Sequence, residues 1–477
     1  MDPHVPVEAE SLVSEEPART CDQTRLPDIP VSQTRLSLLQ YARRMTKNYL
    51  GGFDREVFEK LIVERRYLWF TTVLVNDPDA LRRIMVENCA NYPRAEFTYA
   101  ILKPVLGNGL LTTEGAVWRN HRRQMAPVFD PKLLADYATI MAEVVEDYVE
   151  SLLKLDDGAE IEATRAMMHL TLHIIARTMF SRDSGRLESL IESASRAYHP
   201  QMKFSIWGTI PATLPIWARY KRRKAGKVLA AMNHGVRALI SERAGIPASQ
   251  RPNDLLGQLL KAHESKDAMA LTLEDVRDEV MTIFVAGHET TALALTWTWC
   301  ILALIPEEQE KVYQEVREVL GVRPPRHEDL PRLVYTRMFF DEVVRLYPPI
   351  HTLGWRQAVQ DDYDSGHRIK AGSFISIVPW LLHRHPNLWK DPARFDPQRF
   401  SKEQQSSRHR FSYIPFSAGP HVCIGASFAV TEALLIIVNV LRHFRIGLAT
   451  EKVVNPIGMV TLHPEGPLNV RLYRRDQ

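Results

Sequence analysis

One cysteine in this sequence stands where it can serve as a metal ligand. Cys423 lies in FSAGPHVCIG, residues 416–425, at the start of an apolar helical pattern over 424–442. The backbone amides and the dipole at the start of a helix favour a thiolate. For an isolated cysteine the alternative is a buried structural residue, so the neighbours of Cys423 decide between the two.

Those neighbours suit a flat partner. Gly419 permits a tight backbone turn, and Gly425 lets a planar group approach the chain closely. Phe416 can pack on such a group, and His421 can donate a hydrogen bond to an anion. The loop is therefore predicted to hold one thiolate against a planar metal cofactor. A thiolate beneath haem iron favours O–O bond cleavage.

A second stretch, AGHETT at 286–291, places polar side chains inside a long apolar run. Buried polar groups need a partner or a function. His288 and Glu289 begin the zinc-protease pattern H-E-x-x-H, but Ala292 stands where the second His belongs, which excludes that zinc site. We interpret His288 as a hydrogen-bonded helix histidine and Thr291 as a packing residue.

The two stretches together resemble one family. The pattern F-x-x-G-x-H-x-C-x-G at 416–425 resembles the cysteine-ligand loop of the cytochrome P450 haem-thiolate monooxygenases, in the form with His rather than Arg at position 421. The resemblance extends over roughly 35–475. It implies haem b ligated by Cys423, and activation of O2 with two electrons and two protons. One oxygen atom is then inserted into a lipophilic small molecule, typically as a hydroxyl group.

AGHETT resembles the oxygen-activating stretch of that family. Ala286 and Gly287 are expected to leave a groove for O2 beside the helix. Thr290 can bond back to the carbonyl of residue 286 and open the helix locally. Glu289 is the acid of the family's acid–alcohol pair and is expected to relay protons from solvent.

The resemblance also assigns residues that hold the haem propionates. Trp118 and Arg122, one turn apart on a predicted helix, match the family's tryptophan and basic residue at this place. Arg356 matches a second propionate arginine, and His421 adds a further donor. Fixed, charge-assisted hydrogen bonds suit the binding of two carboxylates.

A further pattern is structural. Glu342-Val-Val-Arg345 resembles the family's E-x-x-R pair, which any helix can carry as an i,i+3 ion pair. It precedes Tyr-Pro-Pro and is followed by DPARFDPQRF at 391–400. In the family, the arginine at the position of Arg399 joins this pair and ties the loop beneath the haem to the core.

The substrate pocket is assigned only by analogy with the family, and its mostly apolar walls suggest a lipophilic substrate. His351 is the polar exception; it either contacts substrate or faces water. A helical stretch near 195–210 is expected to contribute, and residues 106–129 resemble a branch with fatty-acid and terpenoid hydroxylases. The candidate pocket residues are Phe97, Tyr99, Ile101, Ile350, His351, Leu353, Met459 and Val460.

Helical periodicity dominates the elements that must position these residues. Thr272 and Asp275 form a capping-box pattern that opens a long helix to about Leu304, apolar enough to be the core helix. The resemblance implies a mainly α fold with a small β component (α+β) and this helix over the haem. Other helices are predicted over 114–155, 160–182, 184–197, 216–243, 306–320 and before Tyr347-Pro348, and strands over 68–75, 354–359, 373–378, 457–463 and 467–472.

The composition indicates the class of protein and its cellular compartment. The 477 residues are 45% hydrophobic and 25% charged with net charge +3, which is typical of a soluble globular protein and does not indicate nucleic acid. Four scattered cysteines without C-x-x-C favour a reducing, cytoplasmic location. The acidic N-terminus lacks an apolar stretch, so we expect a flexible tail over 1–30, no membrane anchor, and one catalytic domain over 31–477.

Electrons must come from elsewhere, because the sequence shows no flavin domain. We expect a ferredoxin and its reductase, with NAD(P)H as the donor, to dock near Arg408, His409 and Arg410. The alternatives are a peroxide-using peroxygenase, a haem-thiolate isomerase or dehydratase, and a haem sensor without turnover. The peroxygenase and the isomerase or dehydratase tend to lack the acid–alcohol pair, and a sensor has no need of a proton relay.

Overall fold

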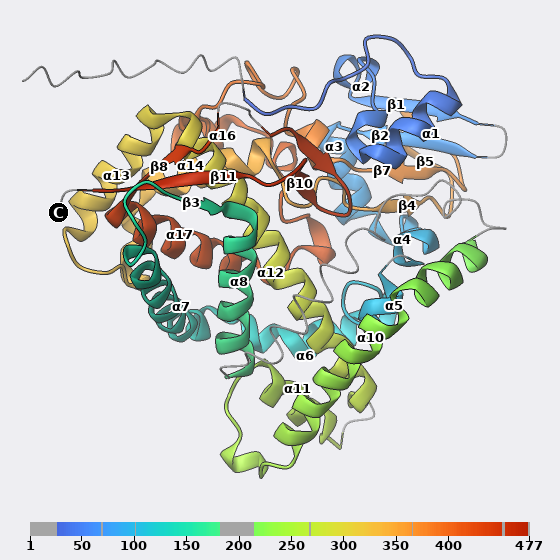
Figure 1. The fold of residues 1–477 in the computed structure, drawn as a ribbon. Coiled ribbons are helices and arrows are strands. Elements are labelled where there is room, and N and C mark those ends of the chain that lie inside the picture. The colour runs from blue at the N-terminus through green and yellow to red at the C-terminus, as the bar shows by residue number, and fades with distance from the viewer. Residues whose placement is uncertain are drawn as a thin grey trace, which may run out of the picture.

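The computed structural model describes residues 26–67, 70–100, 102–181, 214–266, 269–364, 366–450 and 454–475. The helix expected over 184–197, the stretch near 195–210 and the candidate Ile101 lie outside these residues. Helices make up most of the molecule, and the strands β1, β2 and β7 lie to one side of it with α1–α3 (Figure 1). The mainly α fold with a small β component is therefore confirmed.

The central element is helix α12, Leu273–Leu304, which crosses the helical part of the molecule (Figure 1). Both hydrogen bonds of the predicted capping box are present, between the Thr272 and Asp275 side chains and each other's backbone N–H. The helix packs against α8, α14 and α17. Its nearly continuous apolar sequence is explained by burial on all sides.

The remaining helices follow the predicted pattern with one break. The stretch expected to be continuous over 114–155 divides at Asp130-Pro131, where proline starts a new helix and Asp130 caps it. Helices are α1 Leu38–Lys47, α2 Glu56–Glu59, α3 Pro78–Arg82, α4 Glu96–Ala100, α5 Lys103–Leu106, α6 Gly115–Met125, α7 Pro131–Leu153, α8 Ala163–Phe180, α10 Leu214–Ala244, α11 Leu255–His263, α13 Pro306–Leu320, α14 Val334–Leu346, α15 Pro379–Leu382, α16 Lys402–Ser407 and α17 Ala426–His443.

The strands form small sheets. One sheet has the order β1-β2-β7-β4, with β2 and β7 parallel and the other pairs antiparallel. A second, antiparallel sheet has the order β3-β11-β8. Strands are β1 Ile62–Arg66, β2 Thr71–Val75, β3 Ala159–Glu162, β4 Trp355–Gln357, β5 Asp362–Asp364, β6 His367–Ile369, β7 Phe374–Ser376, β8 Phe444–Leu448 and β11 Asn469–Arg474.

The single strand predicted over 457–463 is wrong. Two short strands, β9 Pro456–Gly458 and β10 Leu462–Pro464, pair instead as an antiparallel hairpin. Met459 and Val460 lie in its turn, where their side chains look like strand residues in the sequence. The hairpin places its turn near the middle of α12, as described below.

The expected N-terminal tail also ends earlier than residue 30. Ile29 is buried, and Tyr347 donates a hydrogen bond to the carbonyl of Pro27, 2.9 Å away. Residues 26–30 therefore pack on the core; residues 1–25 are not described.

By length and apolar composition alone, helix α17 could cross a membrane, but most of it is buried inside the protein. It packs against α7, α12 and α13, so its apolar sequence is that of a core helix.

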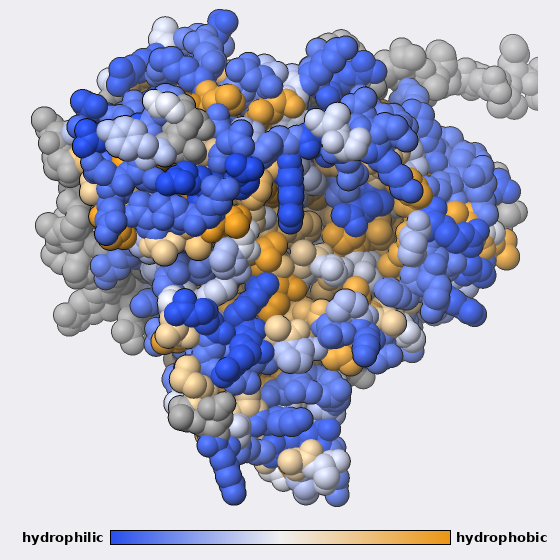
Figure 2. Space-filling view, turned by 180° about the vertical axis from the view of Figure 1, so that it is seen from behind, coloured by the Kyte–Doolittle hydropathy of each residue, from blue (hydrophilic) through white to orange (hydrophobic). Residues whose placement is uncertain are grey.

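One face of the molecule is mostly hydrophilic and carries hydrophobic residues near its middle (Figure 2).

Candidate functional site

The cysteine loop is a compact turn that ends at the start of α17. Gly419 has a left-handed φ of +68°, and a Cβ at this position would collide with the carbonyl oxygen of Met85. The Cys423 N–H then donates to the carbonyl of Phe416, 2.9 Å away, which closes the loop. The predicted need for glycine at 419 thus has a steric cause within the protein itself.

Cys423 lies in a recess. Its residue surface is exposed, yet burial of the thiol among surrounding protein atoms raises its pKa, opposed by the Gly425 N–H and the Arg122 guanidinium. A group that is accessible and still desolvated lines a hollow rather than a convex surface. The Gly425 N–H at the helix start favours the thiolate as expected, but burial of the thiol opposes it; metal coordination deprotonates such a thiol.

Helix α12 has one accessible patch. Over 276–302 its residues are buried except for four half-buried ones. These are Val285, Ala286, Gly287 and Thr290. Ala286 and Thr290 are one turn apart and share a helix face. The partly accessible residues of the helix therefore lie together near its middle, at the stretch singled out by its sequence.

Within this stretch the Thr290 and His288 side chains make the contacts expected of them. Thr290 donates from Oγ1 to the Ala286 carbonyl, 2.8 Å away, as expected. His288 is buried with its ring against the Phe284 carbonyl, as expected for a satisfied histidine. Gly287 also lies against α8, since a Cβ there would lie 2.8 Å from Cδ1 of Ile175. The expected groove for O2 beside Gly287 stays a prediction.

The Glu289 side chain is directed toward the β9–β10 hairpin. Thr461 donates from Oγ1 to Glu289 Oε1 at 2.6 Å, and His463 Nε2 lies 3.3 Å from the same oxygen. Glu289 is 6% exposed and Thr461 5% exposed, so this contact is almost closed to solvent. The sequence analysis did not identify Thr461 or His463, and no motif in the sequence marks them.

Two of the expected propionate contacts, Trp118 and His421, lie beside the carboxylate of Glu114. The rings of Trp118 and His421 have centroids 4.1 Å apart, and His421 Nε2 lies 3.3 Å from Glu114 Oε2. Arg94 Nε donates to Glu114 Oε1 at 2.5 Å, and Tyr99 donates to it at 2.7 Å. Burial opposes ionisation of Glu114, but the hydrogen bonds from His421 and Arg94 hold its pKa well below the usual range. Arg94 and Glu114 were not predicted.

Two further arginines flank this cluster. Arg122 donates to the carbonyl of Val422 at 2.8 Å, beside Cys423. Arg356 is buried, donates from Nη1 to the Tyr92 carbonyl at 2.9 Å, and pairs through its backbone with Arg94. Its Nε has no hydrogen-bond partner within the described part of the chain. Desolvation lowers the pKa of Arg356, so a buried anion beside it would be stabilised.

The E-x-x-R pair has the expected geometry. Arg345 donates two hydrogen bonds to the Glu342 carboxylate, at 2.6 and 2.8 Å, and both side chains are fully buried. Arg399 Nε lies 3.4 Å from Glu342 Oε1, an ion-pair distance without hydrogen-bond geometry. Arg345 also donates to the carbonyls of Pro392 and Arg394, so the cluster ties α14 to the segment before the cysteine loop.

Some candidate pocket residues have other contacts. The Tyr99 hydroxyl bonds Glu114, and Phe97 packs against Trp355 and Phe374 of β4 and β7. His351 is 1% exposed, so the alternative that it faces water is wrong. Its Nε2 lies 3.0 Å from the Met459 carbonyl oxygen and joins the Pro-Pro turn to the hairpin. Ile350, Leu353, Met459 and Val460 are half-buried.

The predicted docking arginines differ from each other. Arg408 is half-buried, lies over the rings of Trp389 and Phe400, and donates to the Arg399 carbonyl at 2.9 Å. The Arg408 guanidinium therefore contacts the core, and its part in docking stays a prediction. His409 and Arg410 are exposed.

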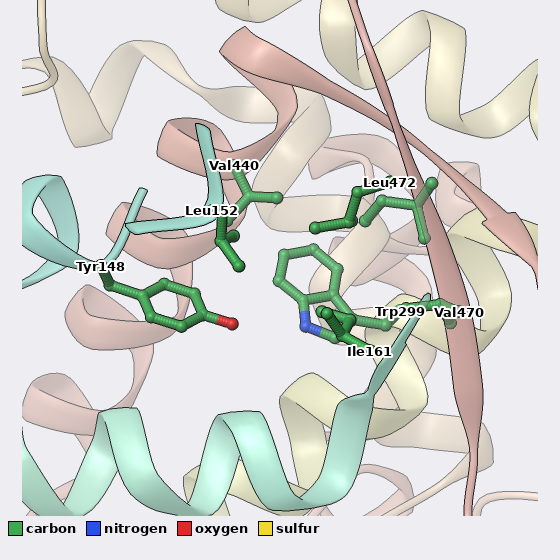
Figure 3. Close-up of a pocket in the computed structure, with 8 residues that line it drawn as sticks. Tyr148, Leu152, Ile161, Trp299, Val440, Val470 and Leu472 are labelled. Carbon is green, nitrogen blue, oxygen red and sulfur yellow. The ribbon is translucent and has the colours of Figure 1, made fainter. Parts of the chain in front are cut away.

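A pocket elsewhere contains none of these residues. It lies between α7, α12, α17 and the β3-β11-β8 sheet, and the Tyr148 hydroxyl points toward the indole of Trp299 (Figure 3). Its lining is otherwise aliphatic. Within the described residues, no group of three or more His, Cys, Asp or Glu side chains could hold a metal ion, so Cys423 is the metal-ligand candidate.

The residues present fit a haem. They provide an accessible cysteine in a recess, an accessible patch on a long helix, and a buried arginine whose Nε is unpaired among the described residues. A mainly α fold with these features defines a haem-thiolate protein.

Comparison with known proteins agrees. Residues 31–470 match the family model described as Cytochrome P450. Cytochrome P450 132 of Mycobacterium tuberculosis is 31% identical over 84% of this chain and 88% of its own length. Cyclooctatin synthase of Streptomyces melanosporofaciens is 33% identical over 77% of this chain and 79% of its own. A crystal structure of the cytochrome P450DA heme domain superposes with TM-score 0.80 at 25% identity, covering 95% of this chain and 99% of that one.

The chain therefore belongs to the cytochrome P450 family. It is an oxygen-dependent monooxygenase, an oxidoreductase, and its cofactor is haem (iron protoporphyrin IX).

Proposed function

We propose that this monooxygenase hydroxylates a lipophilic small molecule held between the hairpin turn and the middle of α12. The observation that carries the proposal is the patch of Val285, Ala286 and Thr290, half-buried in an otherwise buried helix. The bond from Thr461 to Glu289 brings the hairpin turn, with Met459 and Val460, beside this patch. Apolar walls with few polar groups suit a lipophilic ligand.

Cys423 is the proposed iron ligand, and Arg122, Arg356, Trp118 and His421 the proposed propionate contacts. When bound there, the haem supplies the activation of O2 with two electrons. Arg356 would use its unpaired Nε, and the half-buried Arg94 is a further candidate donor. These cations would offset the negative charges of the two haem propionates where little water reaches them.

Thr290 and Glu289 are the proposed proton-transfer residues. The Thr290 hydroxyl lies on the accessible patch, where its bond to the Ala286 carbonyl fixes its position. Glu289, the residue before Thr290, accepts a hydrogen bond from Thr461 of the hairpin. Thr290 would hold the proton at the site of oxygen chemistry, and Glu289 would supply it.

A separate protein is the proposed electron donor, namely a ferredoxin with an NAD(P)H-dependent reductase, in the cytoplasm. Exposed Arg410 beside the cysteine loop would attract an acidic partner. Residues 31–477 are proposed to act as one catalytic domain.

The test compares turnover with different electron sources and examines the role of the Thr290 hydroxyl. NAD(P)H, ferredoxin and reductase should support O2-dependent hydroxylation of a lipophilic compound that binds the enzyme. Thr290→Ala should lower product per O2 several-fold, with hydrogen peroxide accounting for the difference, and Thr290→Ser should restore it. Thr298→Ser, which retains a helix hydroxyl bonded to the Ala294 carbonyl, is the control. Turnover with hydrogen peroxide alone would favour a peroxygenase and contradict the proposal.

A further inference from the structure

Glu289 of the oxygen-activating stretch meets two side chains of the distant β9–β10 hairpin. Thr461 Oγ1 lies 2.6 Å from Glu289 Oε1 and 2.9 Å from His463 Nε2. His463 Nε2 is also 3.3 Å from the Glu289 carboxylate, so the two residues form an ion pair when the imidazole is protonated. An acid, an alcohol and an imidazole thus share one continuous set of hydrogen-bond contacts.

The hairpin that carries Thr461 and His463 is firmly attached. Trp297 of α12 donates to the Leu462 carbonyl at 3.1 Å, and the Leu462 N–H donates to the Pro349 carbonyl at 2.9 Å. The Asn48 side chain bonds both the Pro456 carbonyl and the Gly458 N–H. Residues on both sides of Thr461 are therefore held against the core, which fixes the contact with Glu289.

His463 is the most exposed of the three residues. The side chains of Glu289 and His463 are 8% and 12% exposed, and the whole Thr461 residue is 5% exposed. His463 is the half-buried member of the set, so it is the one that water reaches most easily. The Glu289 carboxylate contacts His463, and His463 also acts electrostatically on the buried His351. Burial lowers the pKa of His351 to about 4, so its ring is neutral near pH 7.

We propose that Thr461 and His463 form the solvent-side half of the proton path to Glu289, and that His463 is its proton-donating entrance. The proposal rests on the monooxygenase function and on the role of Glu289 given above. An imidazole changes charge near physiological pH, which suits it to repeated proton uptake from water.

The transfer balances within the three residues. Protonated His463 gives its Nε2 proton to Thr461 Oγ1 while the Thr461 hydroxyl proton passes to Glu289 Oε1. The result is a neutral imidazole, an unchanged threonine and a neutral carboxylic acid. The Glu289 carboxylic acid then passes its proton on toward Thr290, and the imidazole takes one proton from a hydronium ion or buffer acid in the solvent. Because charge moves only between paired groups, the nearly closed contact holds no unpaired ion at either stage.

Variants of the holoenzyme test the path. His463→Gln and Thr461→Val should each lower product formation about tenfold, less than the roughly 10²–10⁴-fold contributed by a positioned acid because water can partly substitute. The solvent deuterium isotope effect on turnover should rise in both. His367→Gln, on exposed β6, should match the wild type.

His463→Lys separates a relay from an ion pair. An ammonium stays protonated to higher pH than an imidazolium, so the alkaline limb of the pH profile should move upward while activity returns. If Lys restores activity without moving the limb, or if His463→Gln equals the wild type, the relay is wrong.

A spectroscopic measurement checks the coupling without turnover. In reduced, CO-bound protein with ¹⁵N-labelled histidine, the His463 ring signal is identified by its loss in His463→Gln. It should shift in Glu289→Gln and in Thr461→Val, but not in His367→Gln. An unmoved signal would overturn the proposal while leaving the monooxygenase function intact. Absence of O2-dependent turnover in the wild type would instead overturn the function itself.

Discussion

Arg122 donates a hydrogen bond from Nη1 to the carbonyl of Val422, 2.8 Å away, and so joins α6 to the residue before Cys423. Desolvation lowers the pKa of this arginine, and the nearby Cys423 opposes that effect. The guanidinium lies where it can contact both the cysteine loop and an anionic group beside it. Its position links haem retention to the geometry of the loop.

Arg122→Ala should therefore release haem faster. A hydrogen bond to a charged group contributes roughly 1.5–3 kcal/mol, which corresponds to about tenfold or more in the dissociation rate. Transfer of haem to an acceptor protein measures this rate. Arg119→Ala is the matched control, since Arg119 is exposed on the same helix. Equal rates for the two variants would refute a propionate role for Arg122.

Arg345→Leu should destabilise the protein strongly. The change leaves the Glu342 carboxylate buried without its guanidinium partner, and breaking a buried pair costs about 3–5 kcal/mol. Urea unfolding measures the loss. Arg82→Ala removes an exposed i,i+3 partner of Asp79 and should cost less than about 1 kcal/mol. A similar small loss for Arg345→Leu would show that the pair does not support the fold.

His351 should make stability depend on pH. Burial lowers its pKa in the folded protein to about 4, whereas an ordinary histidine has a pKa of about 6.5. Between these values the unfolded state binds the proton more tightly, so the free energy of unfolding falls as pH drops. The loss should total roughly 3 kcal/mol by pH 4.

Urea unfolding of wild type and His351→Gln at pH 7, 5.5 and 4.5 isolates this contribution, because other buried histidines are common to both proteins. The difference in unfolding free energy between the two should shrink as the pH falls. A constant difference would mean that His351 is not the titrating group.

Arg410→Glu should slow electron transfer from an acidic ferredoxin. A single exposed charge changes the association rate several-fold at low salt, and salt should remove the difference. Stopped-flow reduction at two ionic strengths measures both effects. Arg43→Glu, on exposed α1 surface, should leave the rate unchanged. An equal effect of both variants would place the docking surface elsewhere.

Local patterns predicted much of this protein. The capping box at Thr272 and the prolines after Tyr347 define helix ends through residues near in sequence, and both ends lie where expected. The cysteine loop and AGHETT were recognisable for the same reason. The hairpin turn was not, because Met459 and Val460 have the side chains of a strand.

Contacts between distant segments could not be predicted. Glu289 and His463 are 174 residues apart, and nothing near either residue in the sequence indicates the other. The same holds for Glu114 and His421. Gly287 shows a related limit, since the pattern marks a small residue but not which neighbour, here Ile175, requires it.

The most direct test of the account is the absorption spectrum of the reduced, CO-bound protein and of Cys423→Ser. The wild type should show the strongly red-shifted Soret band of a thiolate-ligated haem, and the variant should lose it. A freshly prepared wild type that binds no haem, or a variant that keeps the band, would contradict Cys423 as the iron ligand.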